Sequence, residues 1–313
     1  VITGYKDIET AVDAMKNGAS DFLTKPVDFG QLEKSLQKAC ELVQLRRELA
    51  HYREQQIQKS NFVVGQTQAM KTIIEQSLKA AEAQVSVMIT GENGTGKDVL
   101  AQYIHANGPR ASKPFVAINC AAIQATMLES ELFGHEAGAF TSADRKKPGL
   151  FEIADGGVLF LDEISSMPVE IQAKLLRAIE NHSFMRVGGT SLIKVDIQVI
   201  VASNRDFTTM LEDGSFRRDL YYRLKKIEFE IPPLRDRKGD IPELVGFFIR
   251  TYNGKQGLNI TGMSEQALEA LKNYDWPGNI RELANAVERA IIFCDGETIQ
   301  MGDLPRDIVA PLP

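Results

Sequence analysis

The residues best suited to chemistry in this sequence form a glycine-rich run with one lysine, GENGTGKD, at positions 91–98. The run has the spacing Gly91-x-x-x-x-Gly96-Lys97 and lies between an apolar segment, VSVMIT, and a helical pattern over residues 99–106. In that setting glycines let backbone N–H groups wrap phosphates, the lysine reaches the outer phosphates, and the helix N-terminus favours negative charge. We therefore predict a nucleotide-binding phosphate loop rather than a plain glycine-rich turn. The expected nucleotide-binding residues of this loop are Gly91, Glu92, Asn93, Gly94, Thr95, Gly96, Lys97 and Asp98.

An acidic pair, Asp162-Glu163, follows the apolar run VLFL and supplies the carboxylates that phosphate chemistry needs. Asp98 occupies the position where a phosphate loop usually carries a Ser or Thr ligand for magnesium, so phosphates, water and carboxylates elsewhere must hold the metal. The C-terminal end of a buried parallel strand lies beside the phosphate loop in such sheets. We therefore predict Asp162 as the Mg²⁺ ligand and Glu163 as the base that polarises the attacking water.

These residues need a sheet to bring them together. VSVMIT, FVAIN, GGVLFLDE and IQVIVAS have the content of buried parallel strands, and the segments between them are expected to be helices or loops. The alternation predicts a doubly wound α/β domain. Ser203 and Asn204 end the last of these strands; the pair either contacts the γ-phosphate or orients water, or the Asn simply caps a loop. After PPLRDR only helical patterns follow, over residues 241–252, 264–273 and 279–294, which predicts a small all-helical subdomain.

The composition of the 313-residue chain, 43% hydrophobic and 25% charged, is typical of a globular protein of about two domains. A formal net charge of −6 argues against the whole chain being a nucleic-acid binder. Cys40, Cys120 and Cys294 lie far apart without a CxxC, so we expect buried thiols in a reducing cytoplasm rather than disulfides or a zinc site. No apolar run approaches the ~18 residues of a membrane span, and no signal peptide is evident, so we expect a cytoplasmic protein with no membrane partner.

The start of the chain has a pattern of its own. Residues 1 to about 45 are expected to form a strand, a helix over 8–18, the strand DFLTKP and a second helix, a half-unit too small to close a core. Because the chain opens on Val1 within a strand-like segment, we expect a fragment of a longer protein. Leu42, Leu45, Leu49 and Tyr52 form one apolar stripe on the second helix. The stripe is either a short coiled-coil dimer seam or the packed face of a linker helix.

One large apolar ring lies among small residues in ELFGHEAGAFTSADRKKPG, residues 131–149. Such a segment has little to bury against its backbone entropy and orders poorly by itself. Because most lone phenylalanines lie in a core, the residue chemistry alone favours a surface loop whose Phe140 turns back into the protein.

The motifs GENGTGKD, ELFGHEAGAFTSA, ADGGVLFLDE, ASNRD, FRRDLYYRL and WPGNIRELANAVERA follow one another in this order. With them the chain closely resembles, over residues 61–305, the central ATPase of the bacterial enhancer-binding proteins, AAA+ activators of RNA polymerase carrying sigma-54. The resemblance implies an AAA+ P-loop NTPase with a doubly wound parallel sheet and a C-terminal helical lid. It also implies ATP and Mg²⁺ as cofactors, a ring (hexameric, from dimers when inactive) and remodelling of the sigma-54 polymerase closed complex. The implied domains are a partial receiver domain over 1–45, a linker helix over 46–60, an ATPase subdomain over 61–235 and a lid over 236–313.

The resemblance also assigns a role to the GAFTSA segment, the family's signature loop, which grips the sigma factor. This tip loop comprises Gly138, Ala139, Phe140, Thr141, Ser142 and Ala143, with Phe140 as the contact at its end. Ser142 lies where the family usually has Gly, and a position that requires φ > 0 would be strained by Ser. VGG at 187–189 resembles the second, supporting pore loop.

Further roles follow by position from the same family. Arg217 and Arg223 match its arginine fingers, which reach the γ-phosphate bound to the neighbouring subunit; arginine suits charge developing on phosphate, and the alternative is a surface salt bridge. Asn119 resembles the residue that holds the catalytic glutamate away from water. Arg281 matches the lid residue called sensor two, and Val64 and Gly65 resemble the adenine-pocket segment.

The front end resembles the last part of a response-regulator receiver domain, which places the chain in a two-component system. Thr3, Lys25 and Pro26 match that family's switch threonine and lysine–proline pair, while the strand bearing its phosphate-accepting aspartate is not in this sequence. The family's helix-turn-helix domain is also absent before Pro313, so DNA binding is expected only from that missing domain.

Three functions remain open from the sequence. The first is an ATP-hydrolysing activator that remodels the sigma-54 polymerase complex through the GAFTSA loop. The second is an AAA+ ATPase of the same fold with another target, and the third is a weakly hydrolysing nucleotide-binding regulator. Intact Lys97, Asp162, Glu163, Arg217 and Arg223 argue against the third.

Overall fold

The computed structural model describes residues 2–3, 23–30, 32, 63, 65–140, 143 and 145–309. The chain divides into two units, Val1–Asn61 and Phe62–Pro313. In the first, β1 (Ile2–Thr3) pairs in parallel with β2 (Leu23–Thr24), as expected for a β-α-β half-unit. The helix expected over 8–18, the stripe at Leu42, Leu45, Leu49 and Tyr52, and Cys40 lie outside the described residues.

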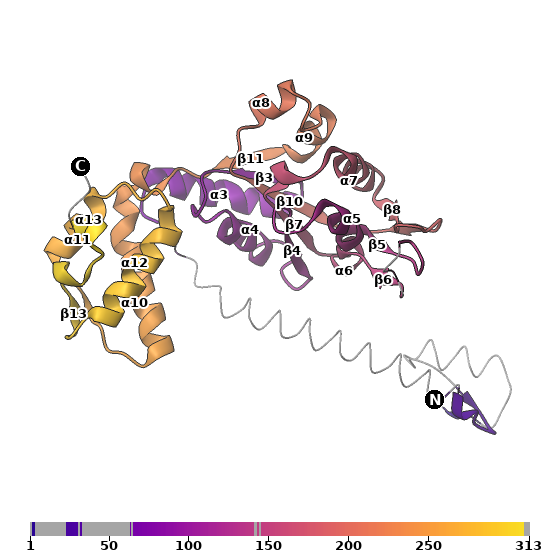
Figure 1. The fold of residues 1–313 in the computed structure, drawn as a ribbon, viewed down its shortest axis with the longest axis horizontal. Coiled ribbons are helices and arrows are strands. Elements are labelled where there is room, and N and C mark those ends of the chain that lie inside the picture. Colours follow the sequence, from indigo (N-terminus) through magenta and orange to yellow (C-terminus); the bar gives the residue numbers. More distant parts are fainter. Residues whose placement is uncertain are drawn as a thin grey trace. The chain divides into compact units, whose positions relative to one another are not determined.

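The second unit is built on a five-stranded sheet of order β11-β3-β10-β7-β4, in which every neighbouring pair is parallel (Figure 1). The strands are β3 (Val87–Thr90), β4 (Phe115–Asn119), β7 (Val158–Asp162), β10 (Gln198–Ser203) and β11 (Ile227–Glu230). The crossovers in this order confirm the predicted doubly wound α/β domain.

Two details of the predicted sheet were wrong. FVAIN was expected to be a buried strand, but β4 lies at the sheet edge and Asn119 and Ala117 are exposed. Residues 227–230 were expected to be helix or loop, but they form the opposite edge strand, β11, paired with β3. Both strands are edges, where only one neighbour and partial burial are needed, so the apolar content that identifies central strands is a poor guide.

Helices cover both faces of the sheet. Alternate residues of each strand point to opposite sides, and the apolar side chains on both sides are buried. On the first face, Val158, Phe160 and Ile200 pack with α3 (Gln68–Ala83) and α4 (Lys97–Ala106). On the second face, Leu159, Leu161 and Val199 pack with a different set of helices. The second face carries α5 (Ala125–Phe133), α6 (Leu150–Ile153), α7 (Val169–Asn181), α8 (Phe207–Glu212) and α9 (Arg218–Leu224).

Two short hairpins extend the second face. In one, β5 (Gly134–His135) pairs with β6 (Lys147–Pro148), and the tip loop lies between them. In the other, β8 (Ser183–Met185) pairs with β9 (Leu192–Lys194), with the 187–189 segment at its turn. A 3₁₀ turn, η1 (Ile164–Ser166), follows β7 and the acidic pair.

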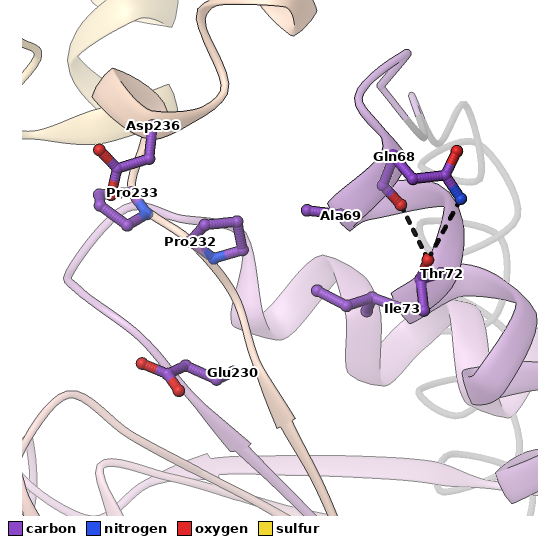
Figure 2. Close-up of a pocket in the computed structure, with 8 residues that line it drawn as sticks. All are labelled: Gln68, Ala69, Thr72, Ile73, Glu230, Pro232, Pro233 and Asp236. Atoms are coloured by element: carbon purple, nitrogen blue, oxygen red, sulfur yellow. Dashed lines mark hydrogen bonds between the residues drawn. The ribbon is translucent and has the colours of Figure 1, made fainter.

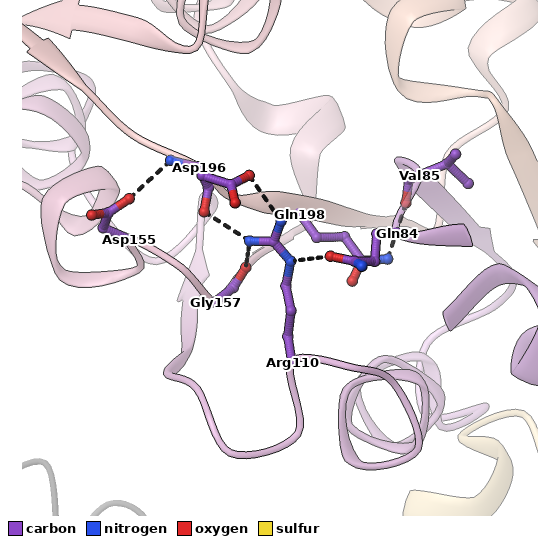
Figure 3. Close-up of polar contacts among 7 residues, drawn as sticks. All are labelled: Gln84, Val85, Arg110, Asp155, Gly157, Asp196 and Gln198. Atoms are coloured by element: carbon purple, nitrogen blue, oxygen red, sulfur yellow. Dashed lines mark hydrogen bonds and ion pairs between the residues drawn. The ribbon is translucent and has the colours of Figure 1, made fainter. Parts of the chain in front are cut away.

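A cluster of backbone carbonyls at the N-terminal edge of the sheet is tied together by Arg110 (Figure 3). Its guanidinium donates to Gly157 O at 3.2 Å, to Asp196 O at 2.7 Å and to Asp196 Oδ1 at 2.8 Å, while Nε donates to Gln84 Oε1 at 2.8 Å. Only 13% of the Arg110 side chain is exposed, so these bonds are largely shielded from water. Arg110 thereby joins the ends of α3, β7 and β10 at the edge away from the phosphate loop.

The C-terminal part is a separate hydrophobic cluster around Trp276, which is fully buried and donates its indole N–H to Leu271 O at 2.7 Å. Its main helices are α10 (Ile241–Gln256), α11 (Glu265–Asn273) and α12 (Asn279–Phe293), preceded by η2 (Leu234–Asp236) and η3 (Lys238–Asp240) and followed by η4 (Met301–Asp303) and α13 (Arg306–Val309). The expectation of an all-helical subdomain was wrong in one respect, since β12 (Gly262–Met263) and β13 (Thr298–Ile299) form a parallel pair.

Two further sequence expectations concern thiols and membranes. Cys120 is buried as expected, and burial, aided by the charges of Asp162 and Glu163, raises the pKa of its thiol to about 12. Cys294 is only half-buried. It follows the last turn of α12, and its S–H donates a hydrogen bond to Gly296 O. Within the described ranges, no helix is long and apolar enough to cross a membrane.

Candidate nucleotide site

The phosphate loop, residues 91–98, connects β3 to α4 through three glycines with left-handed backbone. Gly91, Gly94 and Gly96 have φ values of 146°, 78° and 96°, which L-residues with a Cβ rarely adopt. Helix α4 begins at Lys97, two residues before the predicted start, so its first N–H groups face the loop. The loop therefore has the curvature and the helix N-terminus that suit bound phosphate.

Lys97, the first residue of α4, has 6% of its surface exposed. Its Nζ donates to Gly91 O at 2.9 Å and to Glu92 O at 3.1 Å. Burial lowers the pKa of Lys97, and the carboxylates of Glu163 and Asp162 oppose that shift. The acidic pair therefore lies within electrostatic range of the lysine, as the sequence predicts.

The end of β7 brings the predicted acids next to Asn119 at the end of β4. Asp162 accepts the Asn119 side-chain N–H at 3.0 Å through Oδ2 and the Glu163 backbone N–H at 3.0 Å through Oδ1. Asn119 Oδ1 accepts from the backbone N–H groups of Ala121 and Ala122. Among the described residues Asn119 thus bonds to Asp162 rather than to Glu163, and its predicted restraint on Glu163 stays a prediction.

Glu163 has an unusual backbone, with φ 51° and ψ 45°. This left-handed conformation is costly for a residue with a long side chain, and such residues concentrate at functional sites. Because of this turn, η1 leaves the sheet immediately after Asp162, and Asp162 and Glu163 both lie at the C-terminal end of β7.

The tip of β10 contributes one side chain to the phosphate loop. Asn204 Nδ2 donates to Asn93 Oδ1 at 2.9 Å, so these two predicted residues are brought together. Ser203 is fully buried, and its hydroxyl exchanges hydrogen bonds with the backbone of Arg205. Ser203 therefore stabilises its own loop, and Asn204 is the member of the pair that lies against the phosphate loop.

The lid borders the same site. Arg281 on α12 lies beside Gly94, and its charge lowers the pKa of Lys97. Gly65 is buried with φ 85°, and a Cβ there would lie 2.6 Å from the Asp240 carboxylate. Asp240 accepts the backbone N–H groups of Gln66 at 2.6 Å and Thr67 at 2.8 Å. The predicted adenine-pocket segment is thus fixed by the segment leading to the lid; Val64 lies outside the described residues.

Four contributors to this region were not singled out by the sequence, namely Arg235, Arg237, Asp240 and Asn279. Arg235 and Arg237 both belong to PPLRDR, which indicated only a boundary, and Asn279 belongs to WPGNIREL. Arg237 donates to Thr95 O at 2.8 Å from a buried position. The sequence signal that could have indicated them is the presence of Asn and Arg, whose side chains have a fixed arrangement of hydrogen-bonding groups, in a turn between two apolar clusters.

The backbone N–H groups, the lysine and the carboxylates of this site fit a nucleoside triphosphate with a Mg²⁺ ion that has few protein ligands. Within the part of the chain that the structure describes, no group of three or more His, Cys, Asp or Glu side chains could hold a metal ion. A magnesium ion there would need phosphate oxygens and water in addition to Asp162, which is how Mg²⁺ is commonly held. The three left-handed glycines leave the loop free of side-chain bulk on the phosphate side.

The predicted arginine fingers lie apart from this chain's own phosphate loop. Arg217 forms a two-point ion pair with Asp219, at 3.0 Å and 2.7 Å, and both side chains are exposed. Arg223 lines a cavity of about 120 Å³ with Val85, Ser86 and Gln198, at the N-terminal ends of β3 and β10. Its Nε is buried and has no hydrogen-bond partner among the residues that the structure describes, and a terminal N–H is 3.5 Å from Ile179 O.

The tip loop is held by backbone bonds near its base. Gly138, with φ 81°, donates to Ala143 O at 2.8 Å, and Ala143 donates to Phe140 O at 2.9 Å. Phe140 is 42% exposed, and its ring contacts the edge of His135 with centroids 4.9 Å apart. The ring is therefore neither in the core nor fully in solvent. Thr141 and Ser142 lie outside the described residues.

The two hairpins are joined at their bases. Val187 donates to Gly134 O at 3.0 Å, and Glu136 donates to Val187 O at 3.1 Å. Arg186 pairs with Glu136 and with Glu152 of α6, which raises the arginine's pKa. These ion pairs were not expected from the sequence. They connect the tip-loop hairpin, the second hairpin and the helix that precedes β7.

A second cavity, of about 470 Å³, lies between α3 and the segment that follows β11 (Figure 2). It is lined by Gln68, Ala69, Thr72, Ile73, Glu230, Pro232, Pro233 and Asp236. No residue of the phosphate loop or the acidic pair borders it. We place the nucleotide site at the loop, where backbone donors, lysine and carboxylates converge, rather than in this shallow groove.

Comparison with known proteins agrees with this geometry. Residues 63–230 match the family described as the Sigma-54 interaction domain, and residues 235–312 match the AAA+ ATPase lid domain. The chain is 44% identical to the regulatory protein AtoC of Escherichia coli K12, covering 100% of this chain and 68% of AtoC. It is 43% identical to the response regulator PilR of Pseudomonas aeruginosa, covering 97% of this chain and 67% of PilR.

Solved structures of NtrX from Brucella abortus, in complex with ADP and with ATP, are also similar. Each has a TM-score of 0.74 and 37% sequence identity, covering 100% of this chain and 68% of NtrX. A parallel sheet with a phosphate loop, an acidic pair on β7 and a helical lid define an ATPase of the AAA+ class. Within that class, the chain belongs to the family of sigma-54-dependent transcriptional activators, which confirms the predicted resemblance.

Proposed function

We propose that this chain hydrolyses ATP at the phosphate loop and uses the change to move the tip loop against sigma-54 RNA polymerase. The observation that carries the proposal is the short path between the two. Phe140 is a partly exposed ring on the β5–β6 hairpin, and β6 leads through α6 directly into β7 and Asp162. A change at the acidic pair therefore needs to cross only β7 and one short helix to reach the tip loop.

The proposed chemistry assigns each residue one role. Lys97 binds the outer phosphates, the backbone N–H groups of 91–98 cradle them, and Asn204 orients the attacking water with Glu163 as its base. Asp162 would hold Mg²⁺, which when bound neutralises charge on the phosphate oxygens. Val64, Gly65 and Arg281 border the nucleotide, and Asn119 restrains Glu163 until the partner is engaged.

Assembly completes the site in this proposal. Arg217 and Arg223 of one subunit act on the nucleotide of the next, so turnover requires a ring, which we propose to be a hexamer. Arg217 must then exchange Asp219 for phosphate. The exchange is inexpensive because the Arg217–Asp219 pair is exposed, and exposed ion pairs add little to the stability of a protein.

Capture of sigma-54 by the chain, trapped with ADP and aluminium fluoride, tests this function. We expect a stable complex in the trapped state that Phe140→Ala abolishes. Phe293→Ala is the matched control, because Phe293 is also an exposed aromatic ring, 61% exposed on α12 of the lid, and should leave the complex intact. ATP turnover without any capture would favour an AAA+ ATPase with another target, and neither turnover nor capture would favour a weakly hydrolysing regulator.

A further inference from the structure

The first residue of α12, Asn279, has features that a surface helix start does not need. Its side chain is fully buried, and its backbone is left-handed with φ 55°. Asn is among the few residues that adopt this conformation at modest cost. A buried amide in such a position normally has a specific set of partners.

Those partners lie in the phosphate loop. The Asn279 Nδ2 donates to Asn93 O at 3.0 Å and to Glu92 Oε2 at 3.1 Å. Its Oδ1 accepts the backbone N–H of Leu234 at 2.7 Å. One side chain thus links the loop that is expected to hold phosphate, the segment entering the lid, and the lid helix itself.

Glu92 is held from a second direction by the lid segment. Arg235 donates two bonds to its carboxylate, at 2.6 Å and 2.9 Å. Hydrogen bonds from Arg235 and then from Asn279 lower the pKa of Glu92 to about 2. The carboxylate is therefore ionised at neutral pH and accepts from both residues. Within the described residues, each hydrogen bond of the Glu92 side chain goes to the lid side rather than toward the phosphate cradle.

Backbone contacts fix the same junction. Ile280 donates to Gly94 O at 2.9 Å, and a Cβ on Gly94 would lie 2.3 Å from Gly278 O. Loop and lid therefore approach so closely that one cannot shift without the other. We call the set of Glu92, Asn279 and Arg235 the lid joint.

We infer that Asn279 is a positioning residue for nucleotide binding: it fixes the curvature of the phosphate loop through Asn93 O and the Glu92 carboxylate. Glu92, which the sequence suggests as a nucleotide contact, serves the lid through its side chain. The joint makes the affinity of the loop for a nucleoside triphosphate depend on the position of the lid. This inference rests on the proposed nucleotide site, and on no property of the tip loop.

Asn279→Asp tests the joint with minimal change of shape. The new carboxylate keeps the acceptor for Leu234 N–H but replaces the donor facing Glu92 with a negative charge. We expect binding of a fluorescent ATP analogue with Mg²⁺ to weaken about tenfold, because two hydrogen bonds are lost and like charges meet. KM for ATP should rise more than kcat falls, since no group that contacts the reacting atoms is changed.

A second substitution separates positioning from simple damage. Glu92→Gln combined with Asn279→Asp restores one donor facing one acceptor, and should recover most of the lost affinity. Asn273→Asp, at an exposed position on α11, adds the same charge to the lid and should bind ATP like the unmodified chain. Arg235→Gln, also exposed, tests the joint without touching a buried residue and should weaken binding about threefold.

The inference is overturned if Asn279→Asp is folded by circular dichroism and binds ATP as tightly as the unmodified chain. It is also overturned if the double variant is no better than Asn279→Asp alone, or if Arg235→Gln leaves affinity unchanged. Failure of the unmodified chain to bind ATP would instead contradict the proposed function. Loss of sigma-54 capture with normal ATP binding would concern the tip loop and leave the joint unaffected.

Discussion

The most constrained residue of the site is Glu163, whose left-handed backbone follows directly on an extended strand. Keeping a glutamate at φ 51° costs of order 1 kcal/mol relative to a glycine or asparagine. Its carboxylate would otherwise follow the strand direction, whereas the turn keeps it beside Asp162 and within electrostatic range of Lys97. The local cost is consistent with a role in chemistry rather than in stability.

Glu163→Gln should therefore separate binding from turnover. We expect ATP binding to be retained, because shape and backbone are preserved, while hydrolysis falls by about 10²–10⁴-fold with loss of the general base. Equilibrium binding of ATP and steady-state phosphate release measure the two effects. A variant that hydrolysed ATP at the normal rate would show that Glu163 is not the base.

At this scale the sequence predicts residues whose function depends on near neighbours. The phosphate loop and the acidic pair are each contiguous, so residue type and spacing identify them. Asn279 and Glu92 are 187 positions apart, and nothing in either segment indicates the other. Asp240 likewise binds backbone N–H groups 173 and 174 positions away. Such pairs arise from tertiary packing, which a single sequence does not encode locally.

Among the elements, the two hairpins form one structural unit around the tip loop. Gly188 lies at the turn of the second hairpin with φ 73°, and a Cβ there would lie 2.8 Å from the Ala139 Cβ. The absence of a side chain at Gly188 allows the turn of the second hairpin to approach the tip loop this closely. The backbone bonds between Val187, Gly134 and Glu136 hold the two bases together.

Gly188→Ala should disturb the tip loop more than the nucleotide site. The methyl group must displace Ala139, so we expect capture of sigma-54 in the trapped state to fall severalfold while ATP affinity is kept. Gly257→Ala is the matched control: Gly257 also has positive φ, 66°, but a Cβ there meets nothing within 4 Å. Equal loss of capture in both variants would indicate general backbone strain and contradict a contact between the hairpins.

The strands show where element prediction succeeds and where it fails. The central strands β3, β7 and β10 are continuous apolar runs, because both faces of a covered parallel sheet are buried, and they were predicted. The edge strand β11 reads IEFE, with charges on its open face, and that alternation resembles a surface segment. Edge position, not composition, explains the miss.

Arg110 offers a stability test at the other end of those strands. Arg110→Met removes four hydrogen bonds made by a mostly buried side chain, while the Asp196 and Gly157 carbonyls keep their backbone donors, so we expect a loss of about 2–4 kcal/mol in the free energy of unfolding. Urea denaturation measures it, with Arg177→Met on the exposed side of α7 as the control. ATP affinity should be unchanged. A loss no larger than the control's would mean that the cluster in Figure 3 contributes little.

Across the whole molecule, one predicted catalytic residue, Arg223, lies at the opposite end of the sheet from the phosphate loop of the same chain. Arg223 lies near the N-terminal ends of β3 and β10, whereas the phosphate loop follows the C-terminal end of β3. A strand of four residues separates the two by roughly 13 Å. An arginine at that end of the sheet can act on phosphate only if the phosphate belongs to another subunit.

Mixing two inactive variants tests this arrangement. Arg217→Ala keeps its own Lys97 and Glu163, and Glu163→Gln keeps Arg217, so each lacks what the other supplies. We expect either variant alone to hydrolyse ATP slowly at any concentration, and the mixture to recover a measurable fraction of the normal rate of phosphate release. A mixture that remained as inactive as its components would contradict action between subunits.

The Asp240 contact has a consequence for the order in which the protein acquires its structure. The backbone N–H groups at the start of α3 are satisfied by a carboxylate that leaves the ribosome long after α3 itself. Until Asp240 has been synthesised, those N–H groups can form hydrogen bonds only with water. Domains generally fold in the order in which they are made, so the sheet can form before this acceptor is present. The nascent nucleotide domain therefore lacks the contacts that fix the start of α3 until the beginning of the lid has been translated. A chain truncated before Asp240 would keep its sheet but would lack these contacts.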